Sequence, residues 1–241
     1  MKGCKMGRIQ SIQSFSTFDG PGTRVVVFFQ GCPRQCIFCH NPDSWDIRAG
    51  EEIEAEALLR RIERFRPFLR EPGLTLSGGE PLFQPDFALE LIVKAKRAGW
   101  KVALDTSGWG PKARFLEIVS ATDLVMFSVK HPLAPEKVSQ CELGQVAANW
   151  ESLAGLFIPV WLRYVLIPGW TDEPEALDAL ARLARMVPNL EKIEILPFNR
   201  LAGDKWAKLG WENPLFRKGF PMVTEDQIQK ALDTIRSLTN K

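Results

Sequence analysis

The chain of 241 residues carries 31 Lys and Arg against 29 Asp and Glu, a formal net charge of +2. So small an excess argues against nucleic acid or an anionic membrane surface as a partner. Hydrophobic residues at 45% and charged residues at 25% are typical of globular proteins. No apolar run approaches the roughly 18 residues of a membrane span, and no signal-peptide segment follows the first lysines. The odd number of cysteines, five, favours the reducing cytoplasm.

Short β-rich runs alternate with helical patterns, and no repeat or composition shift marks a domain boundary. Strands are predicted at residues 23–30, 74–77, 101–106, 123–130, 160–167 and 192–198. Helices are predicted at residues 51–69, 85–99 (closed by Gly99), 111–121, 173–187 and about 224–239, the last with Thr224 as N-cap.

This alternation implies an α/β fold whose parallel sheet is connected by crossover helices. Six units fall short of the eight of a complete barrel. We therefore expect a partial (β/α)6 TIM-like barrel in preference to a doubly wound sheet, with residues 1–241 forming a single domain. Three motifs follow predicted strands directly: the cysteine loop at 31–46, "SGGE" at 77–80 and "DTSG" at 105–108. The carboxyl ends of parallel strands hold the functional loops, so the site is expected there.

The cysteine loop has the spacing C-x3-C-x2-C at Cys32, Cys36 and Cys39. Structural zinc needs four ligands, and His40 is awkward as the fourth because neighbouring side chains in an extended loop diverge. A [4Fe–4S] cluster usually has four cysteine ligands, so three would leave one iron open to another molecule. The cluster is the preferred interpretation, and a zinc-stabilised binding module without activity stays as the alternative. The remaining cysteines, Cys4 and Cys141, are interpreted as ordinary filler or surface thiols.

The cysteine spacing, with Phe38 just before the last cysteine, resembles the signature of the radical S-adenosylmethionine (SAM) superfamily. "SGGEPL" at 77–82 resembles the second hallmark of that superfamily, a glycine-rich strand end. The stretch "GRIQSIQSFSTFDGPGTRVVVFFQGCPRQCIFCHNPDSWD" further resembles the glycyl-radical-enzyme activases, and most of all those of pyruvate formate-lyase. "DTSG", "IPVWLRYVLIPGWTD" and "EKIEILPF" continue the resemblance in the same order.

The resemblance implies an oxidoreductase that reductively cleaves SAM to methionine and a 5′-deoxyadenosyl radical, which abstracts hydrogen from a glycine of a partner enzyme. It implies that Cys32, Cys36 and Cys39 hold the cluster and that Phe38 and His40 frame SAM. Further SAM contacts are implied at Gly79, Asp105, Lys130 and Arg163, and Asp19 is implied to receive the glycine-bearing peptide. The alternatives from the residues themselves are salt bridges for Lys130 and Arg163 and a plain turn for Asp19.

Two positions depart from the family pattern. Ser128 stands where related enzymes have an aspartate that, with the "DT" pair at Asp105, holds a monovalent cation. A hydroxyl is a poorer cation ligand than a carboxylate, so the cation site is weakened or Lys130 takes over the charge balance. Asn199 stands where the family usually has a histidine near the adenosine, and an amide still donates and accepts hydrogen bonds there.

The resemblance implies pyruvate formate-lyase as the partner and flavodoxin or ferredoxin as the electron donor. We expect a monomeric protein, and the cysteine count places it in the cytoplasm. Two other enzyme functions stay open, namely activation of another glycyl-radical enzyme, such as anaerobic ribonucleotide reductase, and radical chemistry on a small molecule.

Overall fold

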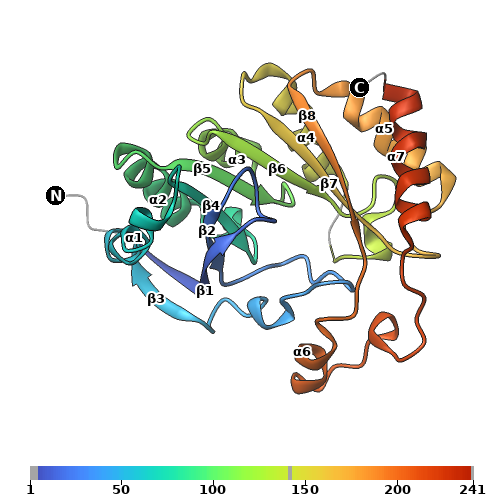
Figure 1. Ribbon diagram of the computed structural model, residues 1–241, viewed down its shortest axis with the longest axis horizontal. Coiled ribbons are helices and arrows are strands. Elements are labelled where there is room, and N and C mark those ends of the chain that lie inside the picture. Colours follow the sequence, from blue (N-terminus) through green and yellow to red (C-terminus); the bar gives the residue numbers. More distant parts are fainter. Residues whose placement is uncertain (1–4, 141–142, 240–241) are drawn as a thin grey trace.

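The computed structural model describes residues 5–140 and 143–239, so Cys4 and Cys141 lie outside the described residues. Eight strands form one curved sheet in the order β3-β1-β2-β4-β5-β6-β7-β8 (Figure 1). Their bounds are β1 Met6–Ser16, β2 Arg24–Phe29, β3 Glu51–Glu54, β4 Gly73–Gly78, β5 Lys101–Thr106, β6 Leu124–Val129, β7 Val160–Leu166 and β8 Leu190–Pro197. From β2 to β8 the neighbouring strands are parallel, whereas β1 pairs antiparallel with both β2 and β3.

The six parallel strands coincide with the six predicted from the sequence, and the sheet ends at β3 and β8 without closing. The expected partial barrel is therefore confirmed. Strands β1 and β3, which extend the sheet beyond β2, were not predicted.

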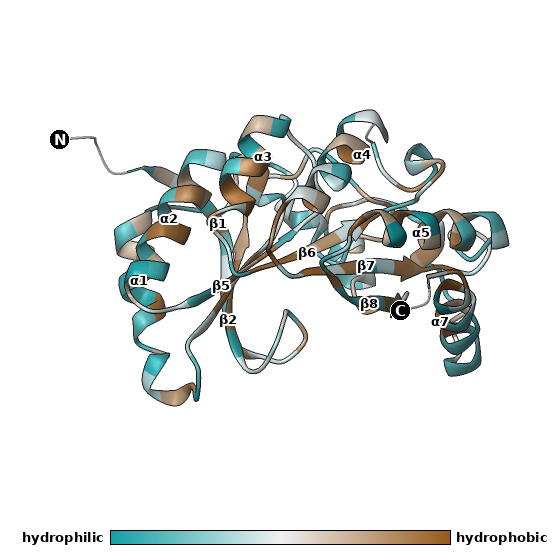
Figure 2. Ribbon diagram, turned by 90° about the horizontal axis from the view of Figure 1, so that it is seen from above, coloured by the Kyte–Doolittle hydropathy of each residue, from teal (hydrophilic) through white to brown (hydrophobic). Residues whose placement is uncertain are grey.

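The α-helices are α1 Ala55–Glu63, α2 Pro85–Arg97, α3 Lys112–Val119, α4 Leu143–Ser152, α5 Pro174–Met186, α6 Gly203–Lys208 and α7 Glu225–Thr239. Short 3-10 helices lie at Pro42–Ser44, Arg66–Phe68, Pro81–Phe83, Pro135–Lys137, Leu153–Gly155 and Pro214–Phe216. Helices α1 to α5 and α7 surround the apolar strands, shown in brown in Figure 2. None of the helices in the two described ranges is long and apolar enough to cross a bilayer.

The helix predicted at 51–69 is wrong at its start, because residues 51–54 form β3. Ile53 is buried there between exposed glutamates, the alternation of a strand, and Ile53 pairs with Gly7 of β1. From Ala55 onward the buried positions follow helical spacing. The cysteine loop is therefore followed by a strand and not directly by a helix. Helix α4 was not predicted.

Two predicted helix ends are confirmed. The Thr224 hydroxyl accepts a hydrogen bond from the backbone N–H of Gln227 at 3.3 Å, and the Gln227 side chain accepts one from the N–H of Thr224 at 2.9 Å. This reciprocal pair is a capping box at the start of α7. Gly99, with a φ of 85°, follows the end of α2 in the left-handed conformation that glycine adopts without strain.

The inner face of the barrel changes from apolar to polar along the strands. Ala103, Met126 and Trp161 belong to an apolar cluster separate from the main core. Two residues further along the same strands come Asp105, Ser128 and Arg163, which point to the same face because side chains in a strand alternate. The carboxyl end of the barrel interior is therefore the polar end.

Candidate active site

A cavity of about 700 Å³ opens at the carboxyl ends of the strands. It is lined by every residue that the sequence singled out for a cofactor, metal or peptide role: Asp19, Cys32, Cys36, Phe38, Cys39, His40, Gly79, Asp105, Ser128, Lys130, Arg163 and Asn199. The fold thus brings these residues together as expected, while their individual roles stay predictions.

The three cysteines are free thiols on the loop after β2, with Cys36 buried and the other two half-buried. Burial raises the pKa of Cys39 to about 11 and that of Cys32 well above its usual range, and the neighbouring Cys36 is the next cause for both. Cysteines bind metals as thiolates. Crowded thiols in such a place ionise only when a cationic centre compensates their charge, as the iron atoms of a cluster do.

Within residues 5–140 and 143–239, no group of three or more His, Cys, Asp or Glu side chains could hold a single metal ion. This search adds no support for a monovalent cation site near Asp105 and Ser128, which stays a prediction. The three cysteines instead share the wall of one cavity, an arrangement that fits a multi-iron cluster.

The segment after β8 is hydrogen-bonded to the cysteine loop. The Trp206 indole of α6 donates a hydrogen bond to the Cys39 carbonyl at 2.9 Å, and the Asn213 amide donates to the Ile37 carbonyl at 2.5 Å. Lys205 donates to the Asn41 side chain at 2.8 Å. These contacts tie the cysteine loop to the segment after β8.

Two glycines let the "SGGE" loop lie against the cysteine loop. Gly78 has a φ of 97°, and a Cβ on Gly79 would lie 2.3 Å from the Gly31 carbonyl oxygen. The Gly79 N–H donates to the Phe29 carbonyl at 2.9 Å, and the Glu80 N–H donates to that of Gly31 at 2.9 Å. A side chain at position 79 would separate the two loops, which explains the glycine.

Glu80 joins the "SGGE" and "DTSG" loops from a fully buried position. One carboxylate oxygen accepts hydrogen bonds from the Thr106 hydroxyl at 2.6 Å and the Leu82 N–H at 3.1 Å. The other accepts from the hydroxyl and the N–H of Ser107, at 2.6 and 2.8 Å. Burial raises the pKa of Glu80, and these donors oppose the rise. Glu80 therefore fixes the geometry between the loops.

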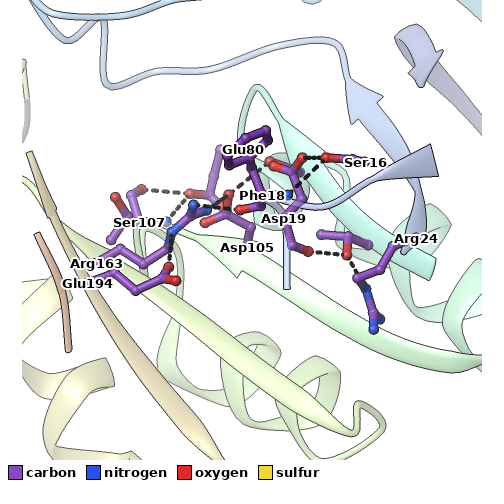
Figure 3. A network of polar contacts seen from close by, with 12 residues as sticks. Ser16, Phe18, Asp19, Arg24, Glu80, Asp105, Ser107, Arg163 and Glu194 are labelled. Atoms are coloured by element: carbon purple, nitrogen blue, oxygen red, sulfur yellow. Dashed lines mark hydrogen bonds and ion pairs between the residues drawn. The ribbon is translucent and has the colours of Figure 1, made fainter. Parts of the chain in front are cut away.

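Arg163 lies among carboxylates on the inner face, as Figure 3 shows. Its Nη1 donates to Asp105 Oδ2 at 3.0 Å, and its Nη2 donates to the Phe18 carbonyl at 3.1 Å. Its Nε lies 3.0 Å from Glu194 Oε2, an ion pair that is not aligned as a hydrogen bond. Arg163 thus forms the salt bridge weighed as the alternative, yet it also lines the cavity, so a SAM contact stays a prediction.

Lys130 and His40 lie on the cavity wall near the cysteines. Lys130 Nζ donates to the Ser128 hydroxyl at 2.9 Å and lies 5.7 Å from the centre of the Phe38 ring. Burial lowers the pKa of His40, and a hydrogen bond with the backbone of Asn199 opposes that effect. The lysine thus stands beside Ser128 on the cavity wall.

Asp19 occupies a hydrogen-bonded position at the cavity wall, and its role, in peptide binding or only in the turn, stays a prediction. Its carboxylate accepts a hydrogen bond from the Ser16 hydroxyl at 2.5 Å, and its carbonyl accepts one from Thr75 at 2.6 Å. The Thr75 hydroxyl in turn accepts from Arg24 Nε at 2.8 Å (Figure 3). Burial raises the pKa of Asp19. This network positions the loop between β1 and β2.

Sequence reasoning missed several residues of the site: Arg34, Glu80, Glu194, Trp206 and Asn213. Glu80 lies in the "SGGE" motif and Arg34 in the cysteine loop. A charged residue inside a motif whose other residues already had a role was the signal that could have identified both. Trp206 and Asn213 carry no local signal, because only the fold brings them to the cysteine loop.

When the sequence is compared with models of known protein families, the Radical SAM superfamily matches residues 26–181. The pyruvate formate-lyase-activating enzyme of Clostridium pasteurianum is 38% identical over 216 residues, which cover 87% of this chain and 90% of the relative. The pyruvate formate-lyase 1-activating enzyme of Escherichia coli K12 is 36% identical over 218 residues, covering 87% and 88%.

Solved structures agree on the fold. A domain of a Bacteroides vulgatus pyruvate-formate lyase-activating enzyme has a TM-score of 0.54 at 20% identity, covering 69% of this chain and 94% of its own. Streptococcus suis SuiB has a TM-score of 0.67 at 11% identity, covering 88% and 45%. The chain belongs to the radical SAM superfamily, in the family of glycyl-radical-enzyme activases that includes the pyruvate formate-lyase-activating enzymes.

Proposed function

We propose that this chain activates pyruvate formate-lyase by generating a radical on a glycine of that enzyme, and that the whole chain acts as one domain. The observation that carries the proposal is the single cavity that holds the cysteine loop, the "SGGE" loop and Asp19 together. The family implies a [4Fe–4S] cluster and SAM, and Cys32, Cys36 and Cys39 would hold the cluster.

When bound, the reduced cluster and SAM supply methionine and a 5′-deoxyadenosyl radical, which takes a hydrogen atom from the glycine. The chain's own residues have the tasks of binding, orientation and protection. The Gly79 backbone, Lys130, His40 and Asn199 would orient SAM. A primary carbon radical attacks most C–H bonds, so the walls must keep other groups out of its reach.

Exposed apolar side chains at the cavity mouth support a protein substrate over a small molecule. Phe18, 83% exposed, lies on the loop between β1 and β2, and Leu201, 86% exposed, follows β8. Both line the cavity although they come from opposite parts of the sequence. Large apolar side chains in such positions commonly belong to interaction surfaces. A glycine-bearing loop entering past them would reach Asp19.

In this proposal a cytoplasmic flavodoxin or ferredoxin supplies the electron, and the chain works as a monomer. We also propose that no strong monovalent cation site exists, because Lys130 already donates to the Ser128 hydroxyl. The lysine would then balance the charge of the SAM carboxylate.

Anaerobic reconstitution tests the function. The loaded protein should contain about four irons and four sulfides, as one [4Fe–4S] cluster requires. The reduced protein should convert SAM to 5′-deoxyadenosine and produce a glycyl radical signal by electron paramagnetic resonance with pyruvate formate-lyase. A signal with anaerobic ribonucleotide reductase alone would assign a different partner. A colourless protein containing zinc would instead identify the binding module, and full SAM cleavage by Cys36→Ala would refute the cluster assignment.

A further inference from the structure

Arg34 is a buried cation for which residues 5–140 and 143–239 provide no counter-ion. It lies between Cys32 and Cys36, and only 2% of its surface is exposed. Nη2 donates to the Ser139 hydroxyl at 3.1 Å, whereas Nε and Nη1 are buried and have no hydrogen-bond partner. In the described ranges 5–140 and 143–239, no carboxylate forms an ion pair with Arg34. Burying a guanidinium in this way costs several kcal/mol unless an anion compensates it.

The segment from Pro135 to Gln140 packs against Arg34. The Arg34 carbonyl accepts a hydrogen bond from the Gln140 N–H at 2.6 Å, and the Ser139 hydroxyl donates to the Pro135 carbonyl at 3.1 Å. The hydrogen bond to Ser139 thus holds one end of the guanidinium. An anion bound in an adjoining cavity would compensate its charge.

Two cavities border the arginine. The smaller, of about 110 Å³, is lined by apolar side chains such as Phe127 and Trp150 together with Lys130 and His131, and its lining includes no carboxylate that could pair with Arg34. The other is the active-site cavity, where Arg34 shares the wall with Cys32 and Cys36. The Arg34 backbone N–H also hydrogen-bonds to the Cys32 sulfur. The main chain of Arg34 therefore contacts one cluster ligand, and the residue lines the cavity that the cluster would occupy.

A [4Fe–4S] cluster on three thiolates is an anion, because the core carries less positive charge than the thiolates carry negative charge. Reduction adds one further negative charge. A fixed buried cation stabilises the reduced form more than the oxidised form, and cluster potentials depend on nearby charge and on hydrogen bonds to sulfur. We propose that Arg34 is the buried counter-ion of the cluster and raises its reduction potential, which makes the cluster easier for its electron donor to reduce.

This inference rests on the cluster that the proposed function requires, but not on the identity of the partner. The test is a potentiometric titration of the reconstituted proteins, following the reduced cluster by electron paramagnetic resonance. Arg34→Gln should lower the ratio of reduced to oxidised cluster at least tenfold at a fixed potential, which equals a fall of about 59 mV for one electron. Arg34→Lys keeps the positive charge, so its reduction potential should lie closer to that of the original protein.

Arg48→Gln is the matched control. The Arg48 side chain is 87% exposed and pairs with Asp46, so water and salt screen its charge. Its removal should leave the potential unchanged. An equal potential in Arg34→Gln and the original protein, both fully loaded, would overturn the proposal. A tenfold loss of SAM affinity in Arg34→Gln without a change in potential would also overturn it, because the arginine would then bind the SAM carboxylate.

If Arg34→Gln binds no cluster, its potential cannot be measured. The iron and sulfide content of Arg34→Lys then decides. If Arg34→Lys loads normally there, the loop needs a cation beside the cluster, as proposed. If Arg34→Lys also fails to load, shape and not charge is what the position requires, and the proposal is wrong. None of these measurements uses the partner, so a missing glycyl radical would refute the proposed function without affecting this result.

Discussion

Arg163 Nη1 and Asp105 Oδ2 lie 3.0 Å apart at the floor of the active-site cavity, on strands separated in the sheet by β6. The arginine side chain is 10% exposed and the aspartate 17%. Nearby carboxylates, Asp105 before Glu194, keep the pKa of Arg163 high against the effect of burial. The pair is a buried salt bridge, so removing one partner leaves the other charge without compensation.

Replacement of Arg163 should therefore be costly. We expect Arg163→Met to lower the free energy of unfolding by about 3–5 kcal/mol, since the largely buried Asp105 would lose its ion-pair partner. Urea denaturation of the apo protein measures this. Lys192→Met is the control, because Lys192 also pairs with Glu194 but is 49% exposed. Its loss should cost at most about 1 kcal/mol, and equal effects of the two variants would contradict the assignment of a buried pair.

Glu80→Gln should destabilise the loops that Glu80 joins. All four of the donors around Glu80 point at carboxylate oxygens. An amide NH₂ in place of one oxygen would face a donor, which costs about 1–3 kcal/mol in unfolding free energy. Thermal or urea unfolding of both proteins checks this. Unchanged stability would mean that the four hydrogen bonds do not persist in solution.

The same variant should change the dependence of stability on pH. The pKa of Glu80 is raised above its ordinary value of 4.5, so the folded chain binds more protons than the unfolded chain. Stability then falls as pH rises from about 4.5 through the folded pKa. Glu80→Gln removes this contribution, so the stability advantage of the original protein should shrink over that range. An advantage that grows with pH would show that the pKa is lowered instead.

Gly79→Ala should weaken SAM binding. The added Cβ would lie 2.3 Å from the Gly31 carbonyl oxygen, a backbone atom, so the "SGGE" loop has to move away from the cysteine loop. We expect at least a tenfold loss of affinity, about 1.4 kcal/mol, in equilibrium binding to the loaded protein. Gly155→Ala is the matched control, because nothing lies within 4 Å of its added Cβ. Normal affinity in Gly79→Ala would show that the close approach of the loops is not required.

The affinity for SAM should be nearly the same in a potassium salt and in the salt of a bulky organic cation. We expect a difference of less than about twofold, which corresponds to about 0.4 kcal/mol. The reason is that Lys130 donates to the Ser128 hydroxyl, which is a neutral and weak ligand for a cation. Ser128→Asp adds a charged oxygen ligand and should gain potassium dependence. Isothermal titration in the two salts measures both proteins. A strong potassium dependence of the unaltered protein would show that a cation site exists despite the serine.

The parallel strands and the motifs at their ends could be predicted because each is a local pattern. Buried runs such as Arg24–Phe29 and the spacing from Cys32 to Cys39 are complete within a few residues. Strands β1 and β3 were missed because their sequences are polar and half-exposed. They form strands by pairing, β1 with β2 and β3 with β1, which the local sequence does not reveal.

The sequence by itself determined the six-stranded parallel barrel, the thiol donor set and the family resemblance, since these depend on residue type and spacing. Only the tertiary structure decided the partners of the charged groups. It buried Arg34 with no counter-ion in the part of the chain that the structure describes, surrounded Glu80 with four donors and paired Arg163 with Asp105. The physical reason is that burial and charge pairing depend on residues far apart in the chain, which come together only when the sheet curves around the cavity.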